Sequence, residues 1–560
     1  MLFREPPTER LPDLNLSYLF GGENMTTVKT VSSLEKIFPQ SDGNFYEVSS
    51  LSMLIGERLN FQLAVNTDEP LRFTVSGAEN LKLNSYNVGF VPSKLPFYSD
   101  HDDDIIESPD GYYPDVLYPT ENGEVEFVNG GWCSIWFEAE SKKAGVNNLV
   151  ITFYNEDNEE VAKSGIELKV INAVLPEQEI IHTNWFHCDC LATWYGVEAF
   201  SEEHWRIIEN FMRVGNAHGL NMILTPLFTP PLDTAVGGER PTMQLVDVTV
   251  TGKDTYSFGF DKLTRWFETA TRCGMKWFEL SHLFTQWGAK HAPKIVDVNG
   301  KQLFGWKTRA GGKEYGSFLE QFAAALKPYL ESNGMKEKCW LHVSDEPNDM
   351  QVRSYGKASR LIARLFPDYK TLDALSDFKF YKKGLVKTPV PSLDHALNFR
   401  GKVDGLWTYY CCGQYKGTAN RFMAMPSYRQ RVLGLQLYKF GCVGFLQWGF
   451  NFWYSQYSKR RINPFEETDA GEAFPSGDSF VVYPGEDGQP IVALRYKLFY
   501  DAFQDLSALK LLESKIGYDE TVKLIENRTG EPLTFVNYER GIEAMLSKRE
   551  AVNKAIEENI

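Results

Sequence analysis

The sequence predicts a multidomain α and β protein with an N-terminal antiparallel β-sandwich, a (β/α)8 TIM barrel and a helical C-terminal tail. A chain of 560 residues is too long for one ordinary domain. Short segments of alternating polar and apolar residues fill the first third of the chain, and alternating strand and helix patterns follow. We therefore expect three domains, at residues 1–178, 179–512 and 513–560.

The sandwich is predicted from apolar residues that alternate along the segments 59–65, 149–153 and 166–170. Each segment places its apolar side chains on one face, and turns rich in glycine, asparagine and aspartate separate the segments. This pattern is typical of antiparallel sheets that pack face to face. The acidic segment 100–104 could bind calcium, but it lacks the glycine-spaced pattern of a calcium loop, so we favour a solvated loop.

The barrel is predicted from a strand and helix rhythm that begins after residue 176. Eight strands over about 270 residues favour a TIM barrel, whose functional groups lie at the carboxyl ends of the strands. A doubly wound open sheet is the alternative, but no glycine-rich phosphate loop follows any strand. The expected strands are 180–186, 221–226, 276–283, 339–344, 370–375, 404–410, 422–424 and 443–448. The expected helices are 203–218, 260–273, 315–331, 351–366 and 495–512.

Composition excludes several kinds of partner. The net charge of −16 argues against nucleic acid and anionic membranes. No run of about 18 apolar residues predicts a membrane span. The first residues contain no apolar stretch typical of a secretion signal, which predicts a cytoplasmic protein, although a secreted form without its signal would look the same. Nothing in the sequence predicts an oligomeric state.

The cysteines predict neither a metal site nor a redox site, and we expect no cofactor. The eight cysteines show no CxxC spacing and lie mostly in apolar stretches, which indicates buried thiols. Cys188 and Cys190 would face one way on a strand and His187 the other, and no second ligand pair follows, which disfavours zinc. Cys411 and Cys412 are interpreted as packing residues.

The most informative segment is 340–347, an apolar strand that ends in Asp345 and Glu346 and is stopped by Pro347. Two carboxylates at the carboxyl end of a barrel strand suit acid–base chemistry on a glycosidic bond, and a helix cap is the plain alternative. Neighbouring strand residues point to opposite faces, so both acids reach one cleft only if the strand bends. Pro347 favours such a bend and biases Glu346 toward an extended conformation.

Polar and aromatic residues at other strand ends predict a sugar-binding face, because flat rings cover the apolar side of a sugar and short polar side chains bind its hydroxyls. The rings could equally belong to the core. The candidate wall residues are Trp407, Tyr409, Trp448, Trp453 and Tyr454. The candidate hydroxyl and carbonyl contacts are His187, Glu279, His282, Gln447 and Asn451.

The expected seventh and eighth strands lack the second carboxylate that a double-displacement glycosidase places roughly 5 Å from its acid. The seventh ends at 423–427 without an acid, and none follows the eighth until Glu466. Adjacent acids suit a different mechanism, in which one protonates the leaving oxygen and the other orients the 2-acetamido group of the substrate. The acetamido oxygen would then attack the anomeric carbon and form an oxazolinium ion.

Several features of the chain follow one another in a fixed order. They are the switch from sandwich to barrel and the segments Asp345-Glu346-Pro347, 475–478, 483–484 and Leu494-Arg495 with Asp505. With these features the chain resembles glycoside hydrolase family 123, the bacterial exo-acting β-N-acetylgalactosaminidases, over roughly residues 20–512. The resemblance implies a retaining, metal-free and substrate-assisted enzyme, in which Glu346 is the general acid/base and Asp345 orients the acetamido group.

The late helix departs from the family pattern of Arg-x-Glu followed by Arg-Asp or Arg-Glu. It reads Arg495-Tyr496-Lys497 and then Tyr500-Asp501. This departure leaves the role of the charges in that helix open, but it does not concern the acidic pair.

The expected activity is release of terminal N-acetylgalactosamine from glycans such as glycosphingolipid headgroups, and the expected partner is a glycan that carries this sugar. Glu346 should have a raised pKa because a neighbouring carboxylate disfavours its ionisation, while Asp345 stays ionised. The alternatives are another N-acetylhexosamine specificity, a non-catalytic glycan-binding protein and, more remotely, a metal-dependent hydrolase.

Overall fold

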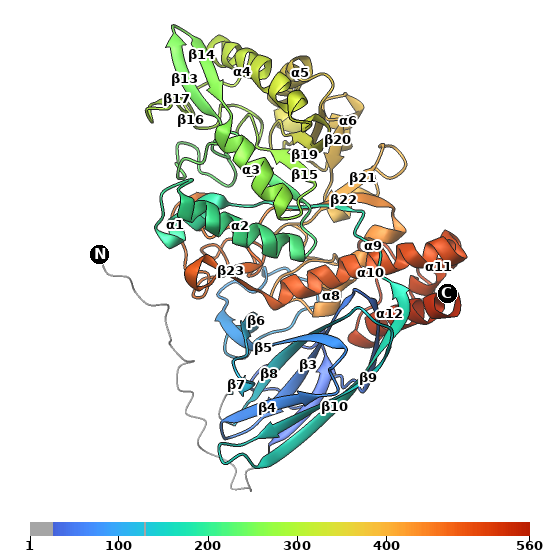
Figure 1. The fold of residues 1–560 in the computed structure, drawn as a ribbon. Helices are drawn as coiled ribbons and strands as arrows, with labels where there is room; N and C mark the ends of the chain where they lie inside the picture. Colours follow the sequence, from blue (N-terminus) through green and yellow to red (C-terminus); the bar gives the residue numbers. More distant parts are fainter. Residues whose placement is uncertain (1–25, 128–129) are drawn as a thin grey trace.

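The computed structural model describes residues 26–127 and 130–560. Figure 1 shows a pair of β-sheets, a barrel and a group of C-terminal helices that lies beside both. The start of the predicted sandwich domain lies outside the described residues, as does the N-terminal segment that suggested a cytoplasmic location, and that location stays a prediction. Within the described ranges, no helix is both long and apolar enough to cross a membrane.

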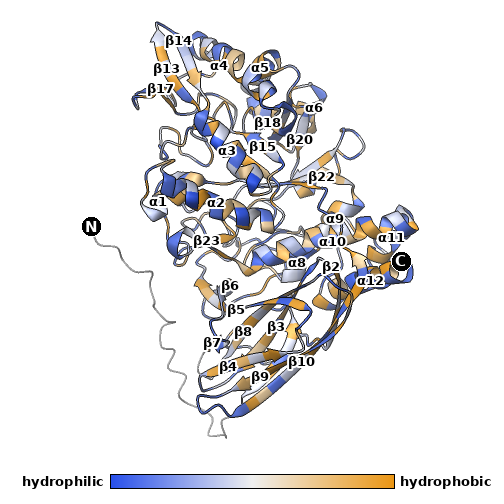
Figure 2. Ribbon diagram, viewed as in Figure 1, coloured by the Kyte–Doolittle hydropathy of each residue, from blue (hydrophilic) through white to orange (hydrophobic). Residues whose placement is uncertain are grey.

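Two five-stranded sheets form the N-terminal sandwich. The first sheet contains, in spatial order, β1 (Thr27–Ser32), β3 (Arg58–Asn66), β8 (Trp132–Ser141), β5 (Leu81–Pro92) and β6 (Tyr112–Pro119). The second contains β2 (Ser50–Ile55), β10 (Glu160–Val174), β9 (Gly145–Tyr154), β4 (Leu71–Ser76) and β7 (Glu124–Val125). The strands pair antiparallel except β2 and β10, which are parallel. Polar and apolar residues alternate along the predicted stretch 166–170 of β10 (Figure 2), and buried and exposed positions alternate along β4 and much of β9.

Eight parallel strands form the barrel. In order they are β11 (Ile181–Asn184), β12 (Met222–Thr225), β15 (Trp277–Leu280), β18 (Cys339–Leu341), β19 (Lys370–Ala374), β20 (Thr388–Val390), β21 (Leu406–Tyr409) and β22 (Cys442–Gln447). β22 pairs with β11, and a single bridge between Ser392 and Tyr409 joins the β20 segment to β21. The predicted barrel is therefore confirmed and nearly closed.

One predicted strand is wrong and one real strand was missed. Residues 422–424 form a buried loop, in which Met423 N–H donates to the carbonyl of Ser476. The sixth strand is β20, which contains only three residues, one of them Pro389, and so shows no alternation. β21 is consequently the seventh strand, while the strand before the acidic pair remains the fourth.

Helices cover the barrel and the ends of the sandwich. They are α1 (Cys188–Tyr195), α2 (Glu202–Ala217), α3 (Asp261–Arg272), α4 (Lys313–Ser332), α5 (Val352–Leu365), α6 (Phe378–Lys382), α7 (Leu393–Ala396), α8 (Ser427–Arg431), α9 (Leu433–Lys439), α10 (Leu494–Ile516), α11 (Tyr518–Ile525) and α12 (Ile542–Glu558). Three short hairpins are β13 (Asp247–Gly252) with β14 (Thr255–Gly259), β16 (Ile295–Val296) with β17 (Gln302–Phe304), and β23 (Val482–Pro484) with β24 (Pro490–Val492).

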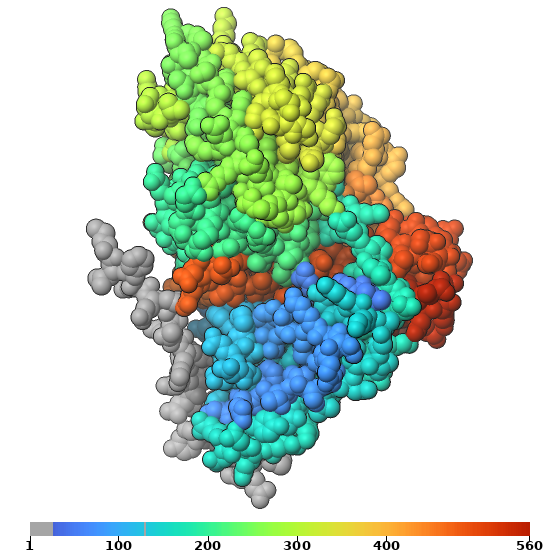
Figure 3. Space-filling view, viewed as in Figure 1, coloured from blue at the N-terminus to red at the C-terminus, as the bar shows by residue number. Residues whose placement is uncertain are grey.

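The helix α10 lies between the sandwich and the barrel, where Figure 3 shows it as an orange-red band. Arg495 donates to Asp115 of β6 at 2.7 Å, and Lys497 donates to Glu138 of β8 at 2.7 Å. Arg495, which matches the family pattern, and Lys497, which replaces its glutamate, therefore both join the two domains. The predicted domain boundary at residue 512 falls inside α10, which continues to Ile516.

The acidic segment 100–104 also joins domains, and the interpretation as a solvated loop is wrong. Asp102 pairs with the buried Arg429 of α8 at 2.7 Å, and Asp103 pairs with Arg540 of the tail at 2.8 Å. The arginine in each pair belongs to the barrel or to the tail, whereas the aspartate belongs to the sandwich domain. These contacts therefore attach the sandwich to the barrel and the tail.

Candidate active site

The acidic pair lies where the chain bends after β18. The strand ends at Leu341, and the chain continues without regular structure to a bend at Asp345. Glu346 then adopts a φ of +39°, in the left-handed region that few non-glycine residues occupy. The extended conformation predicted for Glu346 is therefore wrong. The bend itself removes the alternation that turns neighbouring strand side chains to opposite faces.

Two backbone hydrogen bonds hold this bend. Trp287 N–H, in the loop after β15, donates to the carbonyl of Asp345 at 2.9 Å. Glu346 N–H donates to the carbonyl of Ala374, the last residue of β19, at 3.1 Å. The unusual backbone of Glu346 is thus maintained by the neighbouring strands, as is common for strained residues at functional sites.

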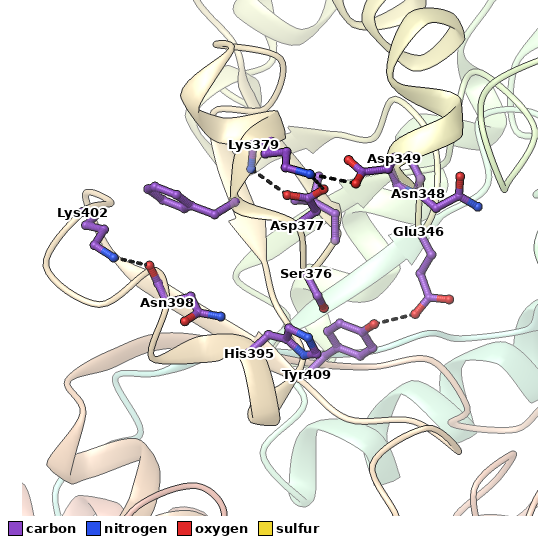
Figure 4. Close-up of a pocket in the computed structure, with 13 residues that line it drawn as sticks. Glu346, Asn348, Asp349, Ser376, Asp377, Lys379, His395, Asn398, Lys402 and Tyr409 are labelled. Atoms are coloured by element: carbon purple, nitrogen blue, oxygen red, sulfur yellow. Dashed lines mark hydrogen bonds and ion pairs between the residues drawn. The ribbon is translucent and has the colours of Figure 1, made fainter.

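The Glu346 carboxylate accepts a hydrogen bond from the Tyr409 hydroxyl at 2.5 Å (Figure 4). Tyr409 is the last residue of β21, three strands away from β18 in the barrel. Burial raises the pKa of Glu346, and the bond from Tyr409 lowers it. The predicted direction of the shift agrees with this environment, but burial rather than the neighbouring carboxylate is its cause.

The Asp345 carboxylate has a still less favourable environment for its charge. Burial raises its pKa well above the ordinary value, and the charge of Glu346 raises it further. The positive charge of His342 opposes these effects. None of the described residues donates a hydrogen bond to this carboxylate. This environment therefore opposes the ionised Asp345 that the sequence predicted, because burial and the charge of Glu346 both favour the neutral carboxyl group.

Three residues before Asp345, His342 lies between two buried carboxylates. Its Nε2 contacts Glu279 of β15, and its Nδ1 lies 3.1 Å from Asp373 of β19. Glu279 also accepts hydrogen bonds from Thr183 at 2.5 Å and Trp185 at 2.8 Å. Glu279 is fully buried in this network, so it does not contact the solvent-filled part of the site.

The same region contains a group of possible metal ligands: His282, His342 and Asp373 have ligand atoms within 4.8 Å of one another. The ring of His282 stacks on His342 at 4.1 Å. Both nitrogens of His342 already face carboxylates, so this ring has no free lone pair for a metal. The donor set fits a charged hydrogen-bond network better than a metal centre.

A pocket of about 720 Å³ opens beside Glu346. Its walls come from residues 346–349, 375–379 and 395–402 and from Tyr409 (Figure 4). Lys379 pairs with Asp349 at 2.8 Å and lies 3.9 Å from Asp377, so its charge is compensated. Lys402 donates to the carbonyl of Asn398 at 2.8 Å. The pocket is therefore polar, with amide, hydroxyl and charged groups that could bind sugar hydroxyls.

A half-buried indole, that of Trp448, follows β22. Its Nε1 donates to the carboxylate of the fully buried Asp478 at 3.0 Å. Burial raises the pKa of Asp478 to about 7, and the charge of Glu346 contributes to the same direction. Gln447 is fully buried, donates to Asp478 and accepts a hydrogen bond from Arg421 at 2.5 Å. These groups fix the orientation of the indole.

The catalytic-domain model of glycoside hydrolase family 123 matches residues 185–512. The chain belongs to glycoside hydrolase family 123. A family 123 glycoside hydrolase from Clostridium perfringens, whose structure was analysed for glycolipid glycan hydrolysis, is similar with a TM-score of 0.73 and 16% identity over 95% of this chain and 98% of that chain. This likeness shows the fold, a sandwich followed by a barrel. A β-glucuronidase from Bacteroides uniformis aligns over 86% of this chain and 51% of that chain with 10% identity, and its TM-score of 0.29 carries no argument. No match was found among curated proteins.

As a family 123 member the chain is a glycoside hydrolase, and the predicted site residues other than the acidic pair divide into three sets. Tyr409 contacts Glu346, and Trp448 is a partly exposed ring. Glu279 and His282 belong to the buried network around His342. The structure places the remaining candidates in the core.

Those core candidates are engaged by other protein groups. The imidazole of His187 faces the carbonyl of Trp448 at 3.0 Å, and Asn451 bonds the backbone of His187. Trp453 donates to the carbonyl of Val482 at 3.2 Å. Trp407 and Tyr454 are nearly inaccessible, the former within the apolar interior of the barrel. Their proposed role is therefore to support the site.

Sequence reasoning missed most of the pocket wall of this family 123 enzyme. Ser376 and Asp377 follow the predicted strand 370–375 directly, and the rule applied to other strand ends would have selected them. His395, Asn398 and Lys402 follow β20, which the sequence did not reveal. Without that strand, nothing linked their segment to Glu346.

Proposed function

We propose that this chain is a retaining exo-β-N-acetylgalactosaminidase that releases terminal N-acetylgalactosamine from glycans such as glycosphingolipid headgroups. The observation that carries the proposal is the bent end of β18, which holds Asp345 and Glu346 together beside an open pocket. The glycolipid glycans named for the Clostridium perfringens relative support the choice of substrate class. The pocket wall contains two other acids, Asp349 and Asp377, and both lie beside the positive charge of Lys379, unlike Glu346.

The proposed reaction uses a nucleophile from the substrate. Glu346 gives its proton to the leaving oxygen while the acetamido oxygen attacks the anomeric carbon, which breaks the glycosidic bond and forms the oxazolinium ion. Asp345 accepts a hydrogen bond from the acetamido N–H and stabilises the positive charge that develops. Glu346 then takes a proton from water, whose oxygen opens the oxazolinium ring. Two inversions at the anomeric carbon give net retention.

In this proposal, substrate binding also decides which of the two carboxyl groups, Asp345 or Glu346, carries the proton that they share. Burial raises the pKa of both carboxyl groups, that of Asp345 well above its ordinary value, and the hydrogen bond from Tyr409 partly offsets this effect on Glu346. An acetamido N–H that donates to Asp345 lowers the pKa of this carboxyl group. The shared proton then resides on Glu346, where the leaving oxygen requires it. The amide of the substrate would thus be needed to convert Glu346 to the protonated form that donates to the leaving oxygen.

The pocket beside Glu346 takes the leaving group in this proposal. The general acid must lie next to the leaving oxygen, and Glu346 forms one wall of this pocket, whereas Asp345 does not line it. The polar groups of Asn398 and Ser376 are suited to the hydroxyls of a second sugar. The terminal sugar would lie on the Asp345 side.

The test is Glu346→Gln, measured on a natural oligosaccharide and on aryl N-acetylgalactosaminides with very good leaving groups. The variant should lose turnover of the oligosaccharide and retain turnover of the activated aryl substrate, which needs little proton donation. Glu320→Gln, which changes an exposed glutamate on α4, is the matched control and should leave both activities intact. Equal loss on both substrates would contradict the acid role of Glu346.

Two further measurements separate the open alternatives. A panel of aryl N-acetylhexosaminides epimeric at C4 distinguishes N-acetylgalactosamine from N-acetylglucosamine specificity. A thiazoline analogue of the oxazolinium ion should inhibit competitively. Glycan binding without turnover of any substrate would indicate a binding protein, and lack of inhibition by the thiazoline would overturn the substrate-assisted mechanism.

A further inference from the structure

The inference concerns His342, which is fully buried and whose two ring nitrogens both face carboxylate oxygens. Nε2 faces Glu279, and Nδ1 lies 3.1 Å from Asp373. A neutral imidazole carries one N–H and one lone pair, so it can donate to only one of them. A lone pair that faced the second carboxylate would be repelled. The contacts are satisfied only if both nitrogens carry a proton.

The two carboxylate oxygens that face the ring carry no proton of their own, because their other partners are N–H groups that can only donate. One oxygen of Asp373 accepts from the backbone N–H groups of Val343 at 2.9 Å and Ser344 at 3.3 Å. Its other oxygen accepts from the hydroxyl of Tyr355 at 2.5 Å. Glu279 accepts from the indole N–H of Trp185, which can only donate. The proton therefore belongs on the imidazole.

We propose that His342 is a permanent imidazolium that positions the catalytic strand end and supplies the positive charge that lets Asp345 ionise. The role toward Asp345 rests on the proposed function, whereas the charge of His342 does not. His342 touches neither substrate nor reacting atoms in this proposal, so it is a positioning residue.

The connection from His342 to the pair runs through the backbone. Asp373, which holds His342, also binds the N–H groups of the two residues that precede Asp345. The Ser344 hydroxyl donates to the carbonyl of Thr285 at 2.8 Å, in the loop that also binds the Asp345 carbonyl. A change in the charge state of His342 would therefore alter both the field at Asp345 and the geometry of the bend.

The groups around His342 all come from barrel elements. Glu279 of β15 and Asp373 of β19 hold the pKa of His342 at about 10, against its burial. Burial and the charge of His342 keep the pKa of His282 well below its ordinary value, so this stacked ring stays neutral. Glu346 lines the pocket, the charge of His342 acts to lower the pKa of Asp345, and Tyr355 of α5 binds Asp373. The stabilising charge of His342 is complete below about pH 6.5 and is lost as the pH rises through about 10.

The first test reads the charge directly and needs no substrate. Protein with 15N-labelled histidine is measured by NMR at pH 8.5, for the wild type and for His342→Gln. The wild type should show one imidazole with both nitrogens protonated, and this signal should be absent from the variant. Nine neutral histidines at this pH would overturn the proposal. An unfolded protein would contain no doubly protonated histidine at pH 8.5, so the wild-type signal also reports the folded network.

The second test uses the pH dependence of kcat/KM with an activated aryl substrate. His342→Gln removes the charge that opposes protonation of Asp345. The acidic limb of the kcat/KM profile should therefore move to higher pH by about one unit or more. His218→Gln, which changes another buried histidine far from the pair in sequence, should leave the limb in place. An unmoved limb in folded His342→Gln would overturn the role toward Asp345. Failure of the wild type on every aryl hexosaminide would instead overturn the proposed function, while the NMR result would stand.

A third variant keeps the test decisive if His342→Gln does not fold. Glu279→Gln leaves the ring bonded to Asp373 but removes one of the two charges that raise the pKa of His342. A new loss of kcat should then appear on the alkaline side, well below pH 10, as the imidazolium loses its proton. A purely structural role predicts a lower activity with an unchanged pH profile, and that result would overturn the proposal.

Discussion

Tyr409 and Glu346 are 63 residues apart in the chain, and the Tyr409 hydroxyl donates to the Glu346 carboxylate at 2.5 Å. This contact joins the end of β21 to the bend after β18, and it favours the ionised form of the Glu346 carboxylate. In the proposed reaction Glu346 gives up its proton in the first step and takes one from water in the second. A partner that favours ionisation makes Glu346 a stronger acid in the first step and a weaker base in the second.

Tyr409→Phe should raise the pKa of Glu346, because it removes the hydrogen bond that stabilises the charged form. The alkaline limb of kcat/KM should move to higher pH, since Glu346 then stays protonated further into the alkaline range. A hydrogen bond to a charged group contributes about 1.5–3 kcal/mol, so kcat should fall roughly 10- to 100-fold where the first step, proton donation by Glu346, is limiting. Tyr518→Phe, at an exposed tyrosine of the tail, is the control. A limb that moves to lower pH would contradict this role.

Asp345→Asn should reduce kcat about 10²- to 10³-fold on natural and activated aryl substrates alike, because orientation of the acetamido group is needed whatever the leaving group. This behaviour differs from that expected for Glu346→Gln, which spares activated substrates. The comparison requires steady-state kinetics of both variants on the same two substrates. Full activity of Asp345→Asn would exclude the orienting role.

Asn398→Ala should raise KM for an oligosaccharide about 3- to 10-fold, as expected for loss of one hydrogen bond, and should not affect a compact aryl substrate. The reason is that Asn398 lines the pocket assigned to the leaving group. Asn299→Ala, at an exposed position outside the pocket, is the matched control. An equal rise of KM on both substrates would place the terminal sugar, not the leaving group, in this pocket.

Asp501→Asn should stabilise the protein at alkaline pH relative to the wild type. Burial raises the pKa of Asp501 to about 7, so the wild type loses stability as the pH rises from about 4 through 7, when this carboxyl group ionises inside α10. The shift corresponds to at most about 4 kcal/mol. Thermal unfolding at pH 5 and pH 8 measures the difference, and Asp519→Asn at an exposed position of α11 is the control. The same effect at both pH values would contradict the titration of Asp501.

The elements with long periodic patterns were predictable. Seven of the eight predicted barrel strands are present, and the predicted helix 203–218 corresponds to α2, whose apolar stripe is buried. β20 was not predictable, because three residues that include a proline carry no periodic signal. The pocket segment after β20 was therefore missed together with its strand.

The sequence also located the acidic pair, because a strand pattern that stops at two acids and a proline is a local property. It could not rank the other candidates, since an aromatic ring at a strand end can face the pocket or the core. Trp407 and Tyr409 share one face of β21 and belong to the same apolar cluster inside the barrel, and it is Tyr409, at the carboxyl end of the strand, that contacts Glu346. Whether a residue at a strand end meets Glu346 depends on how the strands are shifted relative to one another around the barrel.

The sequence by itself determined the order of sandwich, barrel and tail, the position of the acidic pair Asp345 and Glu346 and, through its resemblance, the family. These properties depend on residues close together in the chain. The tertiary structure decided that Glu346 adopts a left-handed backbone, that Tyr409 binds it, and that His342 lies between Glu279 and Asp373. These contacts join residues 30 or more positions apart, and they exist only once the strands have paired in register and excluded water from between them.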